Sequence, residues 1–222
     1  MWSGKIMVVF KDRTDAGKRL AEELEEYAGR DDVILLALPR GGVPVAFEVA
    51  KELDLELDVF IVRKLGVPGY EELAMGAISS GGVKVMNMSV VDSLQISGED
   101  IDSVVEAERK ELERREELYR KGKAKLDVTG RTAILIDDGL ATGATMKAAV
   151  QALRAQKPEN IVVAVPTASK EACEEFAADV DKTVCLTTPE PFYGVGAWYE
   201  DFAQTSDREV CDLLKKAEDM NR

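Results

Sequence analysis

Short apolar runs alternate with longer amphipathic patterns along most of the chain. The runs are rich in Val and Ile and are short enough for buried strands; they span residues 5–10, 33–39, 57–62, 133–137, 161–166 and 183–186. Between them, apolar residues recur every three to four positions, which predicts helices over residues 14–28, 43–53, 144–156, 169–178 and 206–219. Strands that alternate with helices are typical of a mostly parallel sheet covered on both faces. The pattern therefore predicts a doubly wound α/β fold.

One segment departs from this alternation. Residues 98–123 carry charges of both signs, interrupted by only a few apolar side chains. This composition predicts one long inserted helix. Three roles stay open for it: a solvated surface helix held by ion pairs four residues apart, an arm in a dimer, or a lid over an active site.

Length and charge limit the classes of function. A chain of 222 residues can bury a full core, so we expect one domain over residues 1–222. It has 29 basic and 42 acidic residues, a formal net charge of -13, which opposes non-specific binding to nucleic acid or to an anionic membrane. It has no histidine, which excludes Ser-His and Cys-His catalysis and the usual zinc ligand sets. Because of the net charge, any phosphate site must depend on groups in its immediate surroundings. Because histidine is absent, the chemistry of such a site must use carboxylates, lysine, arginine and Mg²⁺.

The cysteines and the apolar runs bear on the compartment. Cys173, Cys185 and Cys211 are odd in number and form no CxxC pair, which suggests neither a disulfide framework nor a zinc site. No apolar run approaches the roughly 20 residues of a membrane helix, and the first residues do not have the pattern of a signal peptide. We therefore expect a protein of the reducing cytoplasm with no membrane partner.

The stretch AILIDDGLATGAT, residues 133–145, carries the most distinctive chemistry. A buried strand ends in two carboxylates, Asp137 and Asp138, and small residues lead into the next helix. Small residues let the backbone approach a ligand, and the start of a helix directs free N–H groups at an anion. The motif lacks the Gly-Lys-Ser/Thr of a P-loop and the spacing of GxGxxG. Carboxylates beside such a cradle suit ribose hydroxyls and a hydrated Mg²⁺, so the stretch predicts a ribose 5-phosphate site.

This stretch resembles the signature of the type I phosphoribosyltransferases, which bind 5-phosphoribosyl 1-pyrophosphate (PRPP). The resemblance implies that Asp137 and Asp138 hold the ribose hydroxyls, directly or through waters of Mg²⁺, and that Ala141 to Thr145 wrap the 5-phosphate. The PRPP-binding residues that it implies are Arg40, Gly41, Gly42, Asp137, Asp138, Gly139, Leu140, Ala141, Thr142, Gly143, Ala144 and Thr145.

Two further segments fit the same resemblance. The strand before Pro39 is followed by Arg40, Gly41 and Gly42, where the family has its pyrophosphate loop. The next strand ends at Arg63 and Lys64, and the family places basic residues there to meet the pyrophosphate. Without the resemblance, the glycine loop would be interpreted as a tight turn, and the Arg63-Lys64 pair as ordinary surface charge. Residues 63–79 correspond to the flexible catalytic flap, in which Glu71 or Glu72 is a candidate general base.

Residues 188–205 correspond to the hood that covers the nucleobase in this family. The segment is dense in aromatic residues, and an aromatic face suits a base. Trp198 is the predicted base contact. The alternative is that these rings anchor the last helix to the sheet.

The resemblance implies a Mg²⁺-dependent transferase with two small-molecule partners, PRPP and a nitrogen acceptor, and a homodimeric assembly. One departure concerns the acceptor: Ala141 stands where some hypoxanthine-guanine relatives carry an aspartate that interacts with the purine. A PRPP- or nucleotide-sensing regulator on the same fold and a hydrolase that uses water as acceptor are the alternatives.

Overall fold

A five-stranded parallel sheet lies at the centre of the computed structural model, which describes residues 10–220 except for the side chain of Glu72. Its strands are β1 (Val33–Ala37), β2 (Glu56–Val59), β6 (Thr132–Ile136), β7 (Asn160–Thr167) and β8 (Lys182–Thr187), in the order β2-β1-β6-β7-β8. Every neighbouring pair is parallel. The predicted α/β fold with a mostly parallel sheet is confirmed.

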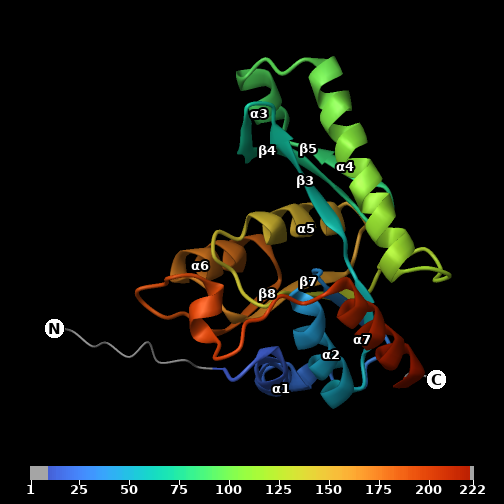
Figure 1. Cartoon of the computed structure of the whole chain (residues 1–222), viewed down its shortest axis with the longest axis vertical. Helices are drawn as coiled ribbons and strands as arrows, with labels where there is room; N and C mark the ends of the chain where they lie inside the picture. Colours follow the sequence, from blue (N-terminus) through green and yellow to red (C-terminus); the bar gives the residue numbers. More distant parts are fainter. Residues whose placement is uncertain (1–9, 221–222) are drawn as a thin grey trace.

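Helices cover both faces of this sheet (Figure 1). One face packs against α1 (Arg13–Glu22), α2 (Gly42–Leu53) and α7 (Asp207–Met220), and the other against α5 (Ala144–Arg154) and α6 (Lys170–Asp179). Successive side chains of a strand point to opposite faces, so Leu35 and Ala37 join the first layer while Ile34 and Leu36 join the second. β1 is therefore apolar at every position and buried throughout, and β6 and β7 are mostly so.

A second, antiparallel sheet stands beside the first. It consists of β3 (Val62–Val67), β4 (Tyr70–Ser79) and β5 (Val83–Met86), followed by the short helix α3 (Met88–Ser93). Residues 63–79, expected to form a flap, are thus a β-hairpin that turns at Pro68 and Gly69, the latter with φ of +80°. The predicted flap therefore consists of two paired strands, because the Pro-Gly turn joins them. Movement of the hairpin stays a prediction.

The long charged segment forms α4 (Gly98–Tyr119), which lies along the small sheet (Figure 1). It begins at Ser97, whose hydroxyl accepts a hydrogen bond from the Asp100 amide (3.1 Å). The side chains of Val105, Leu112 and Tyr119 are buried at seven-residue spacing, which places them on one face of the helix. One stripe of α4 is therefore packed, and only the rest of the helix is solvated.

Two short 3-10 helices, η1 (Glu25–Tyr27) and η2 (Val195–Trp198), complete the elements. Of the strand expected at residues 5–10, only Phe10 lies within the described residues, where it pairs with Tyr199. Between Phe10 and Met220, no helix is long and apolar enough to cross a membrane.

Cys173 and Cys185 correct one prediction. The structure joins them by a disulfide between α6 and β8, with Cα atoms 6.5 Å apart, whereas the spacing of the cysteines suggested none. The pairing was missed because a bond between a helix and the strand that follows it leaves no CxxC pattern in the sequence. Cys211 has a free thiol.

Candidate functional site

The strand order reverses between β1 and β6, and this reversal locates the site. From β1 the chain crosses to β2 on one side, while β6, β7 and β8 extend to the other. In open α/β sheets the ligand crevice lies at such a switch point, outside the carboxyl ends of the strands. The loops that follow β1 and β6, residues 38–41 and 137–143, meet there, and both contain predicted site residues.

Asp138 is held in a dense set of polar contacts. Arg13 of α1 donates to Asp138 Oδ2 from both Nε (2.9 Å) and Nη2 (2.8 Å), and these side chains are only 12% and 15% exposed. The same guanidinium lies 4.0 Å over the ring of Phe202 and donates to the carbonyl oxygen of Ala203 (2.7 Å). Tyr199 of the predicted hood donates its hydroxyl to the Asp138 carbonyl oxygen (2.7 Å). The first helix and residues 199–203 therefore fix the acidic end of β6.

Burial acts on both carboxylates. Burial, followed by the negative charge of Asp138, holds the pKa of Asp137 well above its usual range. Burial also raises the pKa of Asp138, although the Arg13 guanidinium opposes that shift. Two adjacent negative charges are therefore costly in the free protein, and hydroxyl donors or a cation would relieve that cost.

The loop after β1 lies directly against this acidic pair. A Cβ atom at Gly41 would fall inside the carboxylate of Asp138, so no larger residue fits between the two loops. The guanidinium of the neighbouring Arg40 is 3.6 Å from Asp207 at the start of α7, and Asp207 also accepts a hydrogen bond from the Tyr119 hydroxyl of α4 (2.5 Å). Arg40 is therefore positioned by the last helix and by the inserted one.

The small residues after β6 form an open turn into α5. Gly143 is the N-cap with φ of +68°, a conformation that favours glycine, and the helix start has no side-chain cap. The Ser169 hydroxyl donates to the Ala141 carbonyl oxygen (3.1 Å) and supports the turn from α6. Thr142, Ala144 and Thr145 are exposed. An uncapped, accessible helix start is suited to an anion such as a phosphate monoester.

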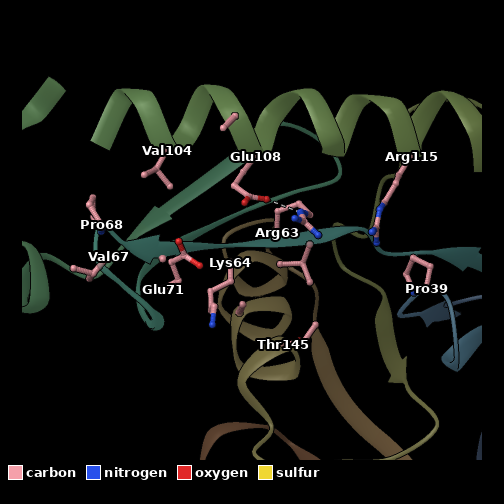
Figure 2. Close-up of a pocket in the computed structure, with 14 residues that line it drawn as sticks. Pro39, Arg63, Lys64, Val67, Pro68, Glu71, Val104, Glu108, Arg115 and Thr145 are labelled. Atoms are coloured by element: carbon pink, nitrogen blue, oxygen red, sulfur yellow. Dashed lines mark hydrogen bonds and ion pairs between the residues drawn. The ribbon is translucent and has the colours of Figure 1, made fainter. Parts of the chain in front are cut away.

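A cavity of about 580 Å³ joins these loops to the hairpin (Figure 2). Pro39 comes from the loop after β1, Thr145 from the start of α5, Arg63, Lys64 and Glu71 from the hairpin, and Glu108 and Arg115 from α4. Arg63 Nε donates to Glu108 Oε2 (2.6 Å). Of the predicted site residues, Arg63, Lys64, Glu71 and Thr145 line this space, whereas residues 40–42 and 137–144 do not. The loop after β1 reaches the cavity through Pro39, and α4 forms a further wall.

The predicted base contact, Trp198, is buried in the free protein. Its side chain is 9% exposed, and its Nε1 has no hydrogen-bond partner among the residues that the structure describes. Tyr193, in the same predicted hood, is 71% exposed. Stacking on a base needs an accessible ring face, so Tyr193 meets that need in the free protein better than Trp198 does.

Sequence reasoning missed four side chains of this region, namely Arg13, Glu108, Arg115 and Tyr199. Three of them contact partners far along the chain: Arg13 is 125 residues from Asp138, Tyr199 is 61 residues from Asp138, and Glu108 is 45 residues from Arg63. Arg115 pairs within its own helix and borders the cavity only because α4 packs beside it. A surface arginine in a first helical turn and a glutamate in a charged helix give no local signal. For the two residues of α4, one hint was available: residues 98–123 follow the predicted flap closely along the chain.

The donor set fits Mg²⁺ only in part. Asp137 and Asp138 offer hard carboxylate oxygens, but no cluster of three or more metal-binding side chains is present between Phe10 and Met220. Mg²⁺ usually keeps several waters and binds one or two carboxylates together with substrate phosphates. The residues present suit a metal that arrives with a phosphorylated sugar.

Similarity to known proteins agrees with this geometry. The family model described as "Phosphoribosyl transferase domain" matches residues 10–197. The Mycobacterium tuberculosis protein named "Putative phosphoribosyl transferase Rv0571c" is 48% identical over 211 residues, which cover 95% of this chain and 47% of that protein. The chain thus spans about half the length of the curated relatives it matches. The crystal structure of TT1426 from Thermus thermophilus is 41% identical, with a TM-score of 0.84, and the match covers 94% of this chain and 98% of that one. The chain belongs to the type I phosphoribosyltransferase family.

Proposed function

We propose that the protein is a Mg²⁺-dependent phosphoribosyltransferase, which transfers the 5-phosphoribosyl group of PRPP to a small nitrogen acceptor and releases pyrophosphate. The observation that carries this proposal is the meeting of the Asp137–Asp138 pair, the uncapped start of α5 and the glycine loop after β1 at one switch point. These three parts suit the ribose, the 5-phosphate and the pyrophosphate of one molecule.

In the proposed reaction, a nitrogen lone pair of the acceptor forms a bond to C1 as the bond from C1 to the pyrophosphate oxygen breaks. Asp137 and Asp138 fix the ribose and favour the positive charge that develops on C1 and the ring oxygen. Arg63 and Lys64 neutralise the leaving pyrophosphate, together with the loop of Arg40, Gly41 and Gly42. Mg²⁺, when bound, would neutralise part of the pyrophosphate charge.

The acceptor is proposed to be a nucleobase or a similar nitrogen heterocycle. Ala141 supplies no carboxylate to such a base, so a general base must come from elsewhere. Glu71 lines the cavity and is the candidate that we favour for this role. The side chain of Glu72, the other candidate, lies outside the described residues. Trp198 stays a predicted base contact, with Tyr193 as the more accessible ring.

Calorimetric titration of PRPP into the protein, with and without Mg²⁺, tests the proposal. We expect saturable binding that needs Mg²⁺ and is lost in the Asp137→Asn, Asp138→Asn double variant. Retained binding in a folded double variant would contradict the assigned carboxylates, and the absence of binding in the wild type would refute the function. Pyrophosphate release only with an added base supports the transferase, release without one supports a hydrolase, and binding without release supports a sensor.

We further propose a homodimer of the cytoplasm. The side chains of Tyr70, Leu73, Met88 and Leu94 expose apolar surface in and after the hairpin. Light scattering that gives the mass of two chains supports the dimer, and the mass of one chain contradicts it. Cell fractionation tests the compartment: recovery in the cytosolic fraction supports the proposal, and recovery in an oxidising compartment, where disulfides such as Cys173–Cys185 persist, contradicts it.

A further inference from the structure

The inserted helix α4 forms a wall of the cavity beside the proposed donor site. We propose that Arg115 of α4 is a binding residue for the pyrophosphate end of the donor, acting beside Arg63 and Lys64. This inference rests on the proposed function, and it gives the insertion a task in the same site.

Arg115 lies at the boundary of the cavity, among residues of the proposed donor site. Arg115 lines the same cavity as Pro39 of the loop after β1, Lys64 of the hairpin and Thr145 of α5. Figure 2 shows its side chain extending from α4 toward Pro39, and Arg63 directed toward Glu108 on the same helix. The side chain of Arg115 is 26% exposed, whereas that of the neighbouring Arg114 is 52% exposed. Of these two adjacent arginines, the one that lines the cavity is the less exposed.

The charges that line the cavity also suit an anion. The cavity has three cationic side chains, Arg63, Lys64 and Arg115, against the carboxylates Glu71 and Glu108. The whole chain has a net charge of -13, so a cationic excess at this place is local. Pyrophosphate carries several negative charges, and the planar guanidinium fork binds two phosphate oxygens at once.

Glu111, the partner of Arg115, has a second arginine partner, so Arg115 can leave it without a large loss of stability. Glu111 accepts from Arg115 Nε (2.7 Å) and also from Arg114 at Nε (2.7 Å) and Nη2 (3.0 Å). If Arg115 turns to a phosphate, Glu111 keeps its two bonds to Arg114, and no carboxylate is left unpaired. Hydrogen bonds from Arg114 and, to a smaller extent, from Arg115 lower the pKa of Glu111 to about 2, far below its usual range. Glu111 thus stays ionised and paired in either arrangement.

Titration calorimetry of inorganic pyrophosphate with Mg²⁺ into the full chain tests the inference. The variants are Arg115→Ala and Arg115→Lys, and Arg114→Ala is the matched control because it bonds to the same Glu111. We expect Arg115→Ala to weaken pyrophosphate binding by about tenfold, the usual effect of losing one charge-assisted contact, and Arg115→Lys to restore part of the loss. Arg114→Ala should change the Kd by less than about twofold, as expected for an exposed ion pair.

Ribose 5-phosphate is the matched ligand, because it lacks the pyrophosphate. Its affinity should be the same in Arg115→Ala as in the wild type, a distinction that a merely structural role of Arg115 would not produce. Equal pyrophosphate binding by Arg115→Ala and the wild type overturns the inference, as does an equal loss of both ligands. Should Arg115→Ala fail to fold, the same criteria apply to Arg115→Gln, which also removes the charge. If the wild type binds ribose 5-phosphate but no pyrophosphate, the inference fails alone; if it binds neither ligand nor PRPP, the proposed function fails with it.

Discussion

Asp137 combines a cost in stability with a proposed role in binding. Burial and the neighbouring Asp138 raise its pKa, so the ionised form is disfavoured in the free protein. We expect Asp137→Asn to stabilise the ligand-free protein by about 1 kcal/mol at neutral pH, as replacements at functional sites often do. The same variant should lose the thermal stabilisation that PRPP and Mg²⁺ give the wild type.

The pH dependence of this difference follows from the direction of the shift. The folded protein binds the proton of Asp137 more tightly than the unfolded chain does, so wild-type stability falls as the pH rises above the ordinary carboxylate pKa. The advantage of Asp137→Asn should therefore vanish in acid and grow toward neutral pH. Urea unfolding of both proteins across this range measures it, and a variant less stable than the wild type at pH 7 would contradict the electrostatic account.

Replacing Arg13 tests how much its ion pair with Asp138 contributes to stability. Arg13→Met removes a mostly buried cation and leaves Asp138 without its partner, which should cost about 3 kcal/mol of stability. Arg19→Met is the control, because Arg19 lies in the same helix but is 46% exposed in its pair with Asp15; we expect a loss below about 1 kcal/mol. Chemical denaturation compares the two, and equal losses would show that burial of the Arg13 pair has no special weight.

At the scale of elements, the sequence predicted the large sheet well and the small one poorly. The central strands β1, β6 and β7 are mostly apolar runs buried on both faces, and such runs can be recognised from the sequence alone. The hairpin of β3 and β4 was hidden because its Gly-rich, charged composition is also that of a loop. Likewise, Asp137, Asp138 and the small residues after them can be recognised as a site from one short stretch of sequence. Arg13 and Arg115 lie near that site only because α1 and α4 pack there.

The disulfide between α6 and β8 is an element-scale feature with its own test. A bond that closes a loop with a sequence separation of 12 residues should contribute about 2 kcal/mol, mainly by restricting the unfolded chain. We expect dithiothreitol to lower the free energy of unfolding of the wild type by that amount and to leave Cys173→Ser unchanged. Cys211→Ser should keep the full response, since its thiol is free. No response in the wild type would show that the pair is reduced in solution.

At the scale of the whole molecule, the net charge of the chain and the charge of the cavity lining have opposite signs. A net charge of -13 surrounds a cavity in which three cationic side chains gather. Like charges over the surface repel one another and destabilise the compact state, while Arg63 and Arg115 in the cavity have carboxylate partners of their own. The two effects respond differently to salt, because repulsion between exposed charges is screened over about 10 Å at 0.1 M ionic strength and closer, partly buried pairs are screened less.

We therefore expect the melting temperature to rise by a few degrees between about 0.05 and 1 M KCl, because screening relieves surface repulsion more than it weakens the paired cations. Glu113→Lys, Glu174→Lys is the matched variant: both glutamates are exposed, on α4 and α6, and the exchange makes the net charge less negative by four. Its salt response should be smaller than that of the wild type. Thermal unfolding followed by circular dichroism measures both slopes. A wild-type melting temperature that falls with KCl would mean that ion pairs, rather than net repulsion, dominate the electrostatics of this fold, and the Arg13 and Arg120 pairs, each mostly buried, would then be the first to examine.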